Sequence, residues 1–233
     1  MAATPETVVQ LKKLGLEIVI EAGAGVQAGY ADAAYTDAGA SVAKDLALEE
    51  VDVLCHVRPL TPKTASRLRS GAITIGLASP STELPTVRAL AKAGITSFAL
   101  ELVPRISRAQ SMDALSSQAL VTGYRAVLEA AVRFPRFFPL YMTAAGTIPP
   151  ARVLVLGAGV AGLQAIGTAK RLGARVSAND IRAASAEEVV SIGGTFIDLD
   201  LDAAAEGTGG YARELSQDSA VRQRELLAPH VAA

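Results

Sequence analysis

A chain of 233 residues, of which 50% are hydrophobic and 19% charged, is long enough for one large or two modest domains with well-buried cores. Its formal net charge of −1, without any Lys/Arg-rich block, argues against nucleic acid or an anionic membrane as a partner. The single cysteine excludes a disulfide framework, and the sequence contains neither a secretory signal pattern nor an apolar run of about 18 residues. We therefore expect a cytoplasmic globular protein without direct membrane insertion.

The first half of the chain alternates helices with short apolar strands. Thr4 followed by Pro5 is a typical helix start, with the threonine as cap, and Thr61 with Pro62 repeats the pattern. Strands are expected at residues 16–21, 51–57, 72–77 and 95–102, and further helices at residues 31–38 and 82–93. This alternation predicts a parallel, doubly wound α/β sheet covered on both faces. Because the chain begins with a helix, we expect this domain to lack its leading strand.

A long helical pattern follows this first sheet. Apolar residues recur at helical spacing over residues 111–134, and prolines then interrupt a connector at positions 135, 139, 149 and 150. We therefore expect two domains: an N-terminal α/β domain with the interdomain helix at residues 1–134, and a second domain at residues 135–233.

Residues 152–180 have the pattern of strand, glycine turn, helix and strand. The apolar run at residues 153–156 leads into Gly157, Gly159 and Gly162, which fit G-x-G-x-x-G where a helix opens. The first glycine permits a tight turn, the second lets a pyrophosphate approach the backbone, and the third lets the helix pack closely on the strand. The start of this helix offers free N–H groups to a diphosphate. A glycine-rich turn without a ligand is the alternative, but the complete strand, turn, helix and strand order favours a dinucleotide site.

Asp180 ends the second of these strands, roughly 20 residues after the turn, where a carboxylate bonds the ribose hydroxyls of a dinucleotide. A carboxylate repels a 2′-phosphate, so NAD(H) is favoured over NADP(H), although Arg182 weakens this preference. Further on we expect a helix at residues 183–192, a third strand at residues 195–199 and a helix around residues 220–227. Because a complete dinucleotide-binding sheet has about six strands, we expect this domain to be truncated at its C-terminus.

A second candidate site lies in the polar segment PRISRAQSMDALSSQ, residues 104–118. It joins an apolar strand to the long helix and brings together Arg105, Arg108, Gln110 and Asp113 with several serines. A solvated helix start explains such a cluster equally well, since Asp113 complements the helix dipole. Its position after a strand and between two domains favours a site.

These motifs together resemble one family. The segment PRISRAQSMD, the run PPARVLVLGAGVAGLQAIGTAKRLGA and the loop GGYA are similar to the NAD(H)-binding component, in the alpha subunit, of proton-translocating NAD(P) transhydrogenase. The opening AATPETV also resembles a relative of this family, alanine dehydrogenase. The resemblance implies two Rossmann-like parallel-sheet domains and direct hydride transfer from NADH to NADP⁺ on a partner, without an acid or a base.

The resemblance also implies an assembly. The partners would be membrane-spanning and NADP(H)-binding transhydrogenase components, and the chain itself would be a homodimer. Its place would be cytoplasmic, at the periphery of the inner or cytoplasmic membrane. No metal is implied.

The resemblance further assigns roles to individual residues. Arg105 and Gln110 would lie beside the nicotinamide ring. Asp113 and Ser116 would hold the carboxamide and the neighbouring loop, and Tyr211 would close over the nucleotide from the tip of a mobile loop. These five residues are the catalytic candidates. The cofactor-binding candidates are Arg105, Ile106, Ser107, Arg108, Gln110, Ser111, Met112, Asp113, Gly157, Ala158, Gly159, Val160, Gly162, Asp180, Ile181, Arg182, Gly210, Tyr211 and Gln223.

Two alternatives stay open. Alanine dehydrogenases use an active-site histidine and lysine, whereas the only histidines here are His56 and His230, and Arg58 stands near the position of the lysine. A non-catalytic, incompletely folded NAD-binding fragment is the other alternative, suggested by the expected loss of the first strand and the truncated sheet.

Overall fold

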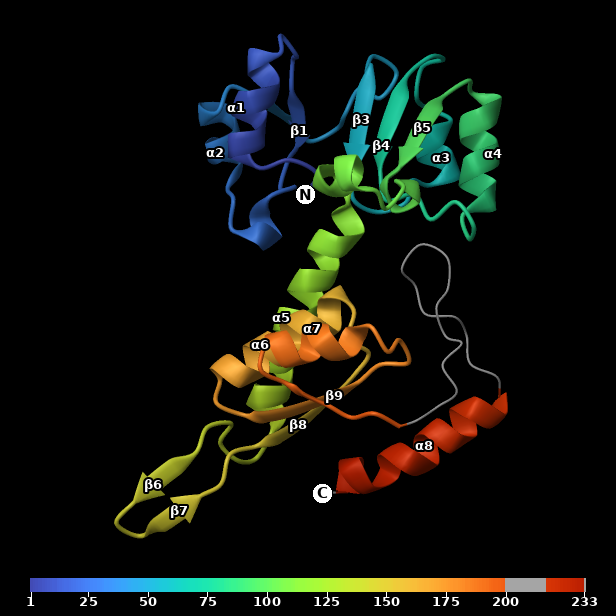
Figure 1. Ribbon diagram of the computed structural model, residues 1–233. Coiled ribbons are helices and arrows are strands. Elements are labelled where there is room, and N and C mark those ends of the chain that lie inside the picture. The colour runs from blue at the N-terminus through green and yellow to red at the C-terminus, as the bar shows by residue number, and fades with distance from the viewer. Residues whose placement is uncertain (200–216, 233) are drawn as a thin grey trace. The chain divides into compact units, whose positions relative to one another are not determined.

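The computed structural model describes residues 1–199 and 217–232 and divides into two compact units, Met1–Asp113 and Ala114–Ala233 (Figure 1). Both units are mixed α/β structures with parallel strands, as the sequence predicted. The second unit begins at the long helix α5 (Ala114–Arg133), which packs extensively on the helix that follows the glycine turn. The expected division into domains at residues 1–134 and 135–233 stays a prediction.

The first unit contains two parallel sheets. Its helices are α1 (Pro5–Lys13), η1 (Val26–Ala28), α2 (Asp32–Asp37), α3 (Pro62–Ala65), α4 (Leu84–Lys92), η2 (Leu100–Leu102) and η3 (Ser107–Met112). Its strands are β1 (Val19–Glu21), β2 (Ser41–Ala43), β3 (Val53–His56), β4 (Ile73–Gly76) and β5 (Thr96–Ala99). The strands β1 and β2 form one pair, and β3, β4 and β5 form a separate sheet in that order. The sequence did not predict β2, whose three residues are too few to show a period.

Both expected Thr-Pro helix starts are confirmed. Thr4 Oγ1 accepts a hydrogen bond from the N–H of Thr7 at 3.1 Å, and Pro5 opens α1. Thr61 Oγ1 accepts from the N–H of Thr64 at 3.1 Å in the same way. The threonine oxygen satisfies one of the N–H groups that the first helical turn leaves without a partner.

The second unit holds a sheet in the order β10-β9-β8 and a separate hairpin. Its strands are β6 (Tyr141–Thr143), β7 (Gly146–Ile148), β8 (Arg152–Leu156), β9 (Arg175–Asn179) and β10 (Thr195–Phe196). Its other helices are α6 (Val160–Arg171), α7 (Ser185–Ser191) and α8 (Gln217–Ala232). The hairpin of β6 and β7 lies in the region expected to be a proline-punctuated connector, and in Figure 1 it projects away from the sheet and helices of its unit.

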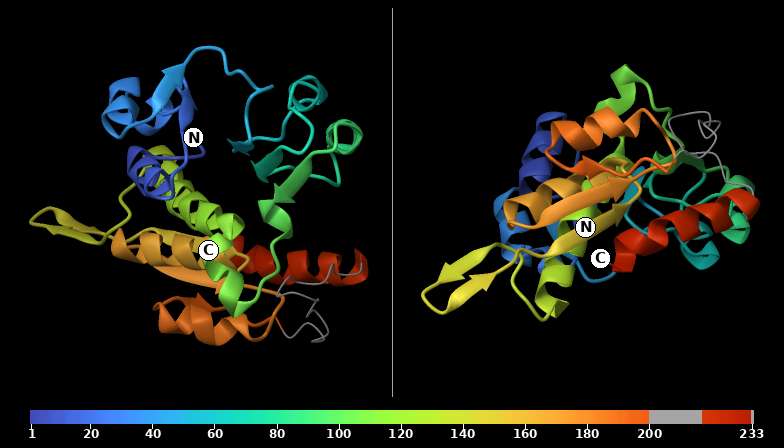
Figure 2. Two further views of the ribbon diagram at one scale, coloured as in Figure 1. Left: turned by 90° about the horizontal axis from the view of Figure 1, so that it is seen from above. Right: turned by 60° about the horizontal axis from the view of Figure 1, so that its bottom comes forward.

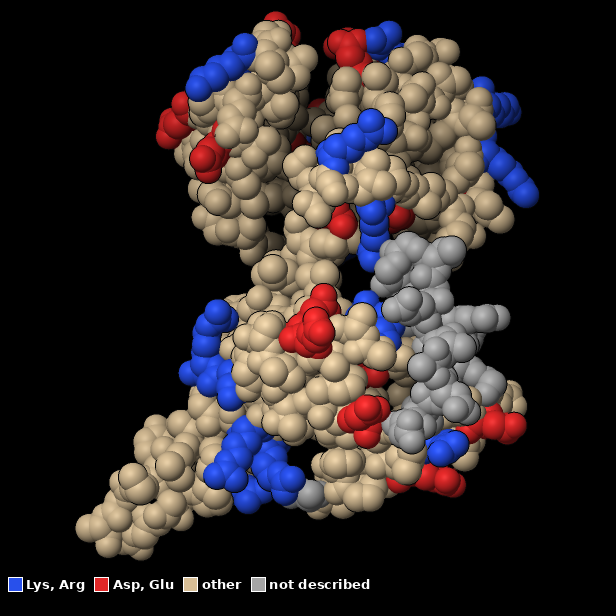
Figure 3. Space-filling model, in the orientation of Figure 1, with Lys and Arg blue, Asp and Glu red and all other residues tan. Residues whose placement is uncertain are grey.

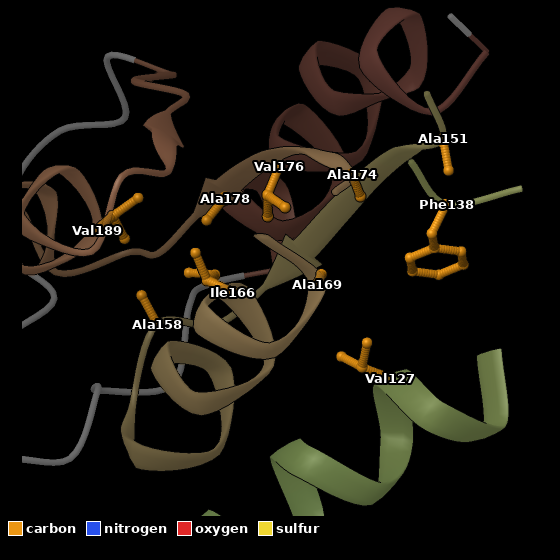
Figure 4. Packing of buried hydrophobic residues seen from close by; sticks show 10 residues of the cluster. All are labelled: Val127, Phe138, Ala151, Ala158, Ile166, Ala169, Ala174, Val176, Ala178 and Val189. Atoms are coloured by element: carbon orange, nitrogen blue, oxygen red, sulfur yellow. The ribbon is translucent and has the colours of Figure 1, made fainter. Parts of the chain in front are cut away.

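Strand alternation divides the side chains of this sheet between two faces. Val153, Val155, Val176 and Ala178 join the buried cluster with α5, α6 and α7, in which Ile166 is fully buried (Figure 4). The intervening residues point the other way, because successive side chains of a strand alternate. On that face Leu154 packs with Ile197, Leu199 and Leu227, so α8 covers the side of the sheet opposite to α6 (Figure 2).

A glycine allows α5 and α6 to approach closely. Gly123 of α5 is buried, and a Cβ at this position would lie 2.0 Å from the carbonyl oxygen of Ala161 in the first turn of α6. No side chain larger than hydrogen fits there without moving a backbone. The long helix therefore fixes the position of the turn at which α6 begins.

Charged side chains are dispersed. On the face of the described residues shown in Figure 3, Lys and Arg lie interspersed with Asp and Glu among large uncharged areas. Within residues 1–199 and 217–232, none of the helices is long and apolar enough to cross a membrane.

Candidate functional site

The glycine turn connects β8 to α6 in a conformation that two of its glycines make possible. Gly157 has a φ of 92°, a left-handed conformation that other residues rarely adopt, and its N–H donates to the carbonyl of Asn179 at 2.8 Å. A Cβ on Gly162 would lie 1.8 Å from the carbonyl oxygen of Gly157. These contacts hold the start of α6 against the carboxyl ends of β8 and β9.

Gly159 differs from its neighbours because it meets nothing. A Cβ at this position would have no heavy atom within 4 Å, and its φ of −77° is ordinary for any residue. Gly159 is also the cap of α6 and, having no side chain, leaves the N–H groups of the first turn uncapped. An open backbone at the positive end of a helix fits a diphosphate group, for which it offers both access and donors.

Asp180 follows β9 and binds back to this turn. Its Oδ2 accepts from the N–H of Ala158 at 2.6 Å and from Nη2 of Arg182 at 3.2 Å. Its Oδ1 accepts from the N–H of Arg182 at 2.8 Å and from Nε of Arg182 at 3.0 Å. The side chain is only 7% exposed. Burial, the largest influence, raises the pKa of Asp180, but the hydrogen bonds from Arg182 and Ala158 together hold that pKa below its usual value.

Asn179, which the sequence analysis did not single out, ties three elements together beside Asp180. Its carbonyl accepts from Gly157, and its buried side-chain Nδ2 donates to the carbonyl of Ile197 at 2.8 Å. Its Oδ1 accepts from Nε2 of Gln223 in α8 at 3.2 Å. Gln223 is thus placed against the sheet edge that carries Asp180, and its expected contact with a nucleotide stays a prediction. Only the pairing of β9 with β10 and α8 reveals the position of Asn179.

The polar segment at residues 104–118 closes the first unit and opens α5. Its residues 107–112 form the 3-10 helix η3 rather than the first turn of the long helix. The buried residue here is Ala109, at 3% exposure, which leaves the polar candidates outside. The exposed candidates are Arg105, Ile106, Ser107, Arg108, Gln110, Ser111 and Met112. Asp113 and Ser116 are half-buried. That this segment and the glycine turn meet in one site stays a prediction, since they belong to different units.

Other candidates are placed as follows. Ala158 is fully buried, Val160 is exposed and opens α6, and Ile181 is half-buried next to Asp180. Gly210 and Tyr211 lie outside the described residues. Among the residues that are described, no three His, Cys, Asp or Glu side chains form a group that could hold a metal ion. An open concavity of ≈ 490 Å³ involves Arg171, Leu172 and Gly173, at the end of α6 remote from the glycine turn, and it has no part in this site.

Comparison with known proteins identifies relatives over the whole chain. The N-terminal domain of alanine dehydrogenase/PNT matches residues 1–122, and the C-terminal domain of the same family matches residues 126–233. An NAD(P) transhydrogenase subunit alpha chain of Rhodospirillum rubrum is 51% identical over 97% of this chain and 62% of its own length. The crystal structure of transhydrogenase from Sinorhizobium meliloti superposes with a TM-score of 0.86 at 46% identity, over 99% of this chain and 62% of that one.

Alanine dehydrogenase is a more distant relative. The enzyme of Mycolicibacterium smegmatis is 28% identical over 97% of this chain and 59% of its own length. The chain thus spans about three fifths of these relatives, with 62% of the first and 59% of the last. Because its two halves match both domains of one family in order, the chain belongs to the alanine dehydrogenase/PNT family.

Proposed function

We propose that this chain is the NAD(H)-binding part of a proton-translocating NAD(P) transhydrogenase, which passes hydride from NADH to NADP⁺ held by a partner component. The observation that carries the proposal is the open backbone at Gly159, set at the uncapped start of α6 and next to the carboxylate of Asp180. The likeness to transhydrogenase alpha subunits, which exceeds the likeness to alanine dehydrogenase, supports the same reaction.

The residues of the turn hold the nucleotide in this proposal. The N–H groups at the start of α6 bind the diphosphate, and Gly159 leaves room for it. Asp180 binds the adenosine ribose, with Ile181 and Arg182 beside it. When bound, the nicotinamide of NADH supplies the hydride.

The polar segment serves the other end of the nucleotide. Arg105 and Gln110 orient the nicotinamide ring, while Asp113 and Ser116 fix its carboxamide and Tyr211 closes over the bound molecule. Hydride passes directly between two nicotinamides, so these residues position the rings and exclude water rather than move protons. Proton translocation belongs to the membrane-spanning and NADP(H)-binding components, and the chain sits peripherally on the cytoplasmic side.

A homodimer completes the proposal, and the hairpin of β6 and β7 supports it. All six of its strand residues are exposed. Met142 is 76% and Tyr141 45% exposed, and Leu140 beside them is 51% exposed. Exposed apolar side chains on a projecting element are typical of an interface.

Titration of the chain with NADH and, separately, with NADPH tests the proposal through nucleotide fluorescence. We expect saturable binding of NADH and binding of NADPH that is at least about tenfold weaker, because Asp180 repels a 2′-phosphate. Hydride transfer to an NADP⁺ analogue is then measured after mixing with the NADP(H)-binding component of a transhydrogenase. Absence of NADH binding by a cooperatively unfolding chain would reject the proposed function.

A further inference from the structure

Within the described part of the chain, the acceptor positions of the Asp180 carboxylate are already filled. A carboxylate offers about four lone-pair sites, two on each oxygen. Four donors occupy them: the N–H groups of Ala158 and Arg182, and the Nε and Nη2 of the Arg182 side chain. The Asp180 side chain is 7% exposed and that of Arg182 is 22% exposed, so the pair is largely closed to solvent.

The four donors are not equally replaceable. The N–H of Ala158 belongs to the glycine turn, and the N–H of Arg182 belongs to the backbone that leaves β9, so both are fixed by the fold. The guanidinium hangs on a flexible side chain and donates twice, with one N–H to each carboxylate oxygen. A ribose likewise offers two neighbouring hydroxyl donors, at positions 2′ and 3′. The guanidinium therefore stands where the ribose diol would bind.

We infer that Arg182 determines nucleotide selectivity as an internal competitor: its guanidinium must leave Asp180 before the ribose of NAD(H) binds. This inference rests on the proposed function, because it takes the glycine turn as the nucleotide site. Arg182 opposes NAD(H) in two ways. It occupies the acceptors of the ribose diol, and it neutralises the carboxylate that repels a 2′-phosphate.

The variant Arg182→Met tests the inference because it keeps much of the length of the side chain and removes both donors and the charge. We expect the dissociation constant of NADH to fall roughly threefold or more, since binding no longer breaks two charge-assisted hydrogen bonds. The dissociation constant of NADPH should rise by a similar factor. Simple loss of folding stability would weaken both nucleotides together.

Matched variants separate competition from other effects. In an Asp180→Asn background, adding Arg182→Met should change NADH affinity by less than about twofold, because a neutral amide does not hold the guanidinium. Arg175→Met, at the opposite end of β9, removes an exposed arginine of the same unit and should alter neither affinity. Arg182→Lys, which cannot reach both carboxylate oxygens at once, should give an intermediate gain and decides the question if Arg182→Met does not fold.

The outcomes distinguish the two claims. Wild-type binding of NADH, together with equal or weaker binding by a folded Arg182→Met or by Arg182→Lys, overturns the inference and leaves the proposed function standing. A gain that persists in the Asp180→Asn background also overturns it, because the competition then does not act through the carboxylate. A wild-type chain that binds no NADH overturns the proposed function and the inference together.

Discussion

Gly159 and Gly162 stand three residues apart in one turn, yet a methyl group would meet very different surroundings at each. Gly159→Ala points its Cβ into open space at an ordinary φ, so we expect the free energy of unfolding to change by about 1 kcal/mol or less. NADH affinity should fall at least about tenfold, because the methyl group occupies the approach of the diphosphate. Isothermal titration and urea unfolding measure the two quantities on one sample.

Gly162→Ala supplies the contrast at the same scale. Its Cβ would lie 1.8 Å from the carbonyl oxygen of Gly157, so this variant should lose roughly 1–3 kcal/mol of unfolding free energy. Equal loss of stability in both variants would show that Gly159 is structural rather than open for a ligand.

Asp180 also predicts a response to acid. Because its pKa is lower in the folded chain, its contribution to stability is present above the ordinary value of 3.8 and is lost as pH falls through the folded pKa. We therefore expect Asp180→Asn to be less stable than wild type near about pH 6, and the difference to shrink below about pH 3.5. Urea unfolding at both pH values checks this, with Asp218→Asn at the start of α8 as a control carboxylate. A difference that does not depend on pH would contradict it.

At the scale of elements, the contact between α5 and α6 positions the nucleotide turn. Gly123→Ala would drive a methyl group into the backbone of Ala161, so we expect a loss of roughly 1–3 kcal/mol in unfolding free energy together with weaker NADH binding. Gly167→Ala in α6 is the matched control. Its Cβ would find only Arg171 Nη1 at 3.7 Å, so it should raise helix stability by about 0.5–1 kcal/mol. A Gly123→Ala variant as stable as Gly167→Ala would refute the close packing.

At the scale of the whole molecule, the projecting hairpin predicts self-association. Met142→Glu places a charge on its exposed apolar surface, and we expect it to weaken the proposed dimer by about tenfold or more, roughly what loss of a buried interface contact costs. Sedimentation velocity over a concentration series measures this. Val132→Glu on α5, where the valine is 84% exposed, is the control and should leave the mass unchanged. Wild type and Met142→Glu of equal mass at all concentrations would reject the hairpin as the interface.

Local chemistry made much of this fold predictable from sequence. Thr4 and Thr61 cap their helices through atoms only three residues away, and the strand, glycine turn and helix at residues 152–171 depend on φ values and on close packing that only glycine permits. The period of apolar residues likewise predicted α5 and the parallel sheets. The short strands β2, β6 and β7 escaped prediction because three residues carry no readable period, and their pairing comes from distant or following chain.

The sequence by itself therefore determined the α/β class, the glycine turn and the acid that follows it, because each of these depends on neighbouring residues. Only the tertiary structure decided how the site is closed. It brought Gln223 to Asn179 across 44 residues, set Gly123 against Ala161, and placed the guanidinium of Arg182 on Asp180. Arg182 stands two residues from Asp180 in the sequence, but whether its side chain turns to that carboxylate or to solvent depends on burial and on the folded turn at Ala158, which sequence spacing does not contain.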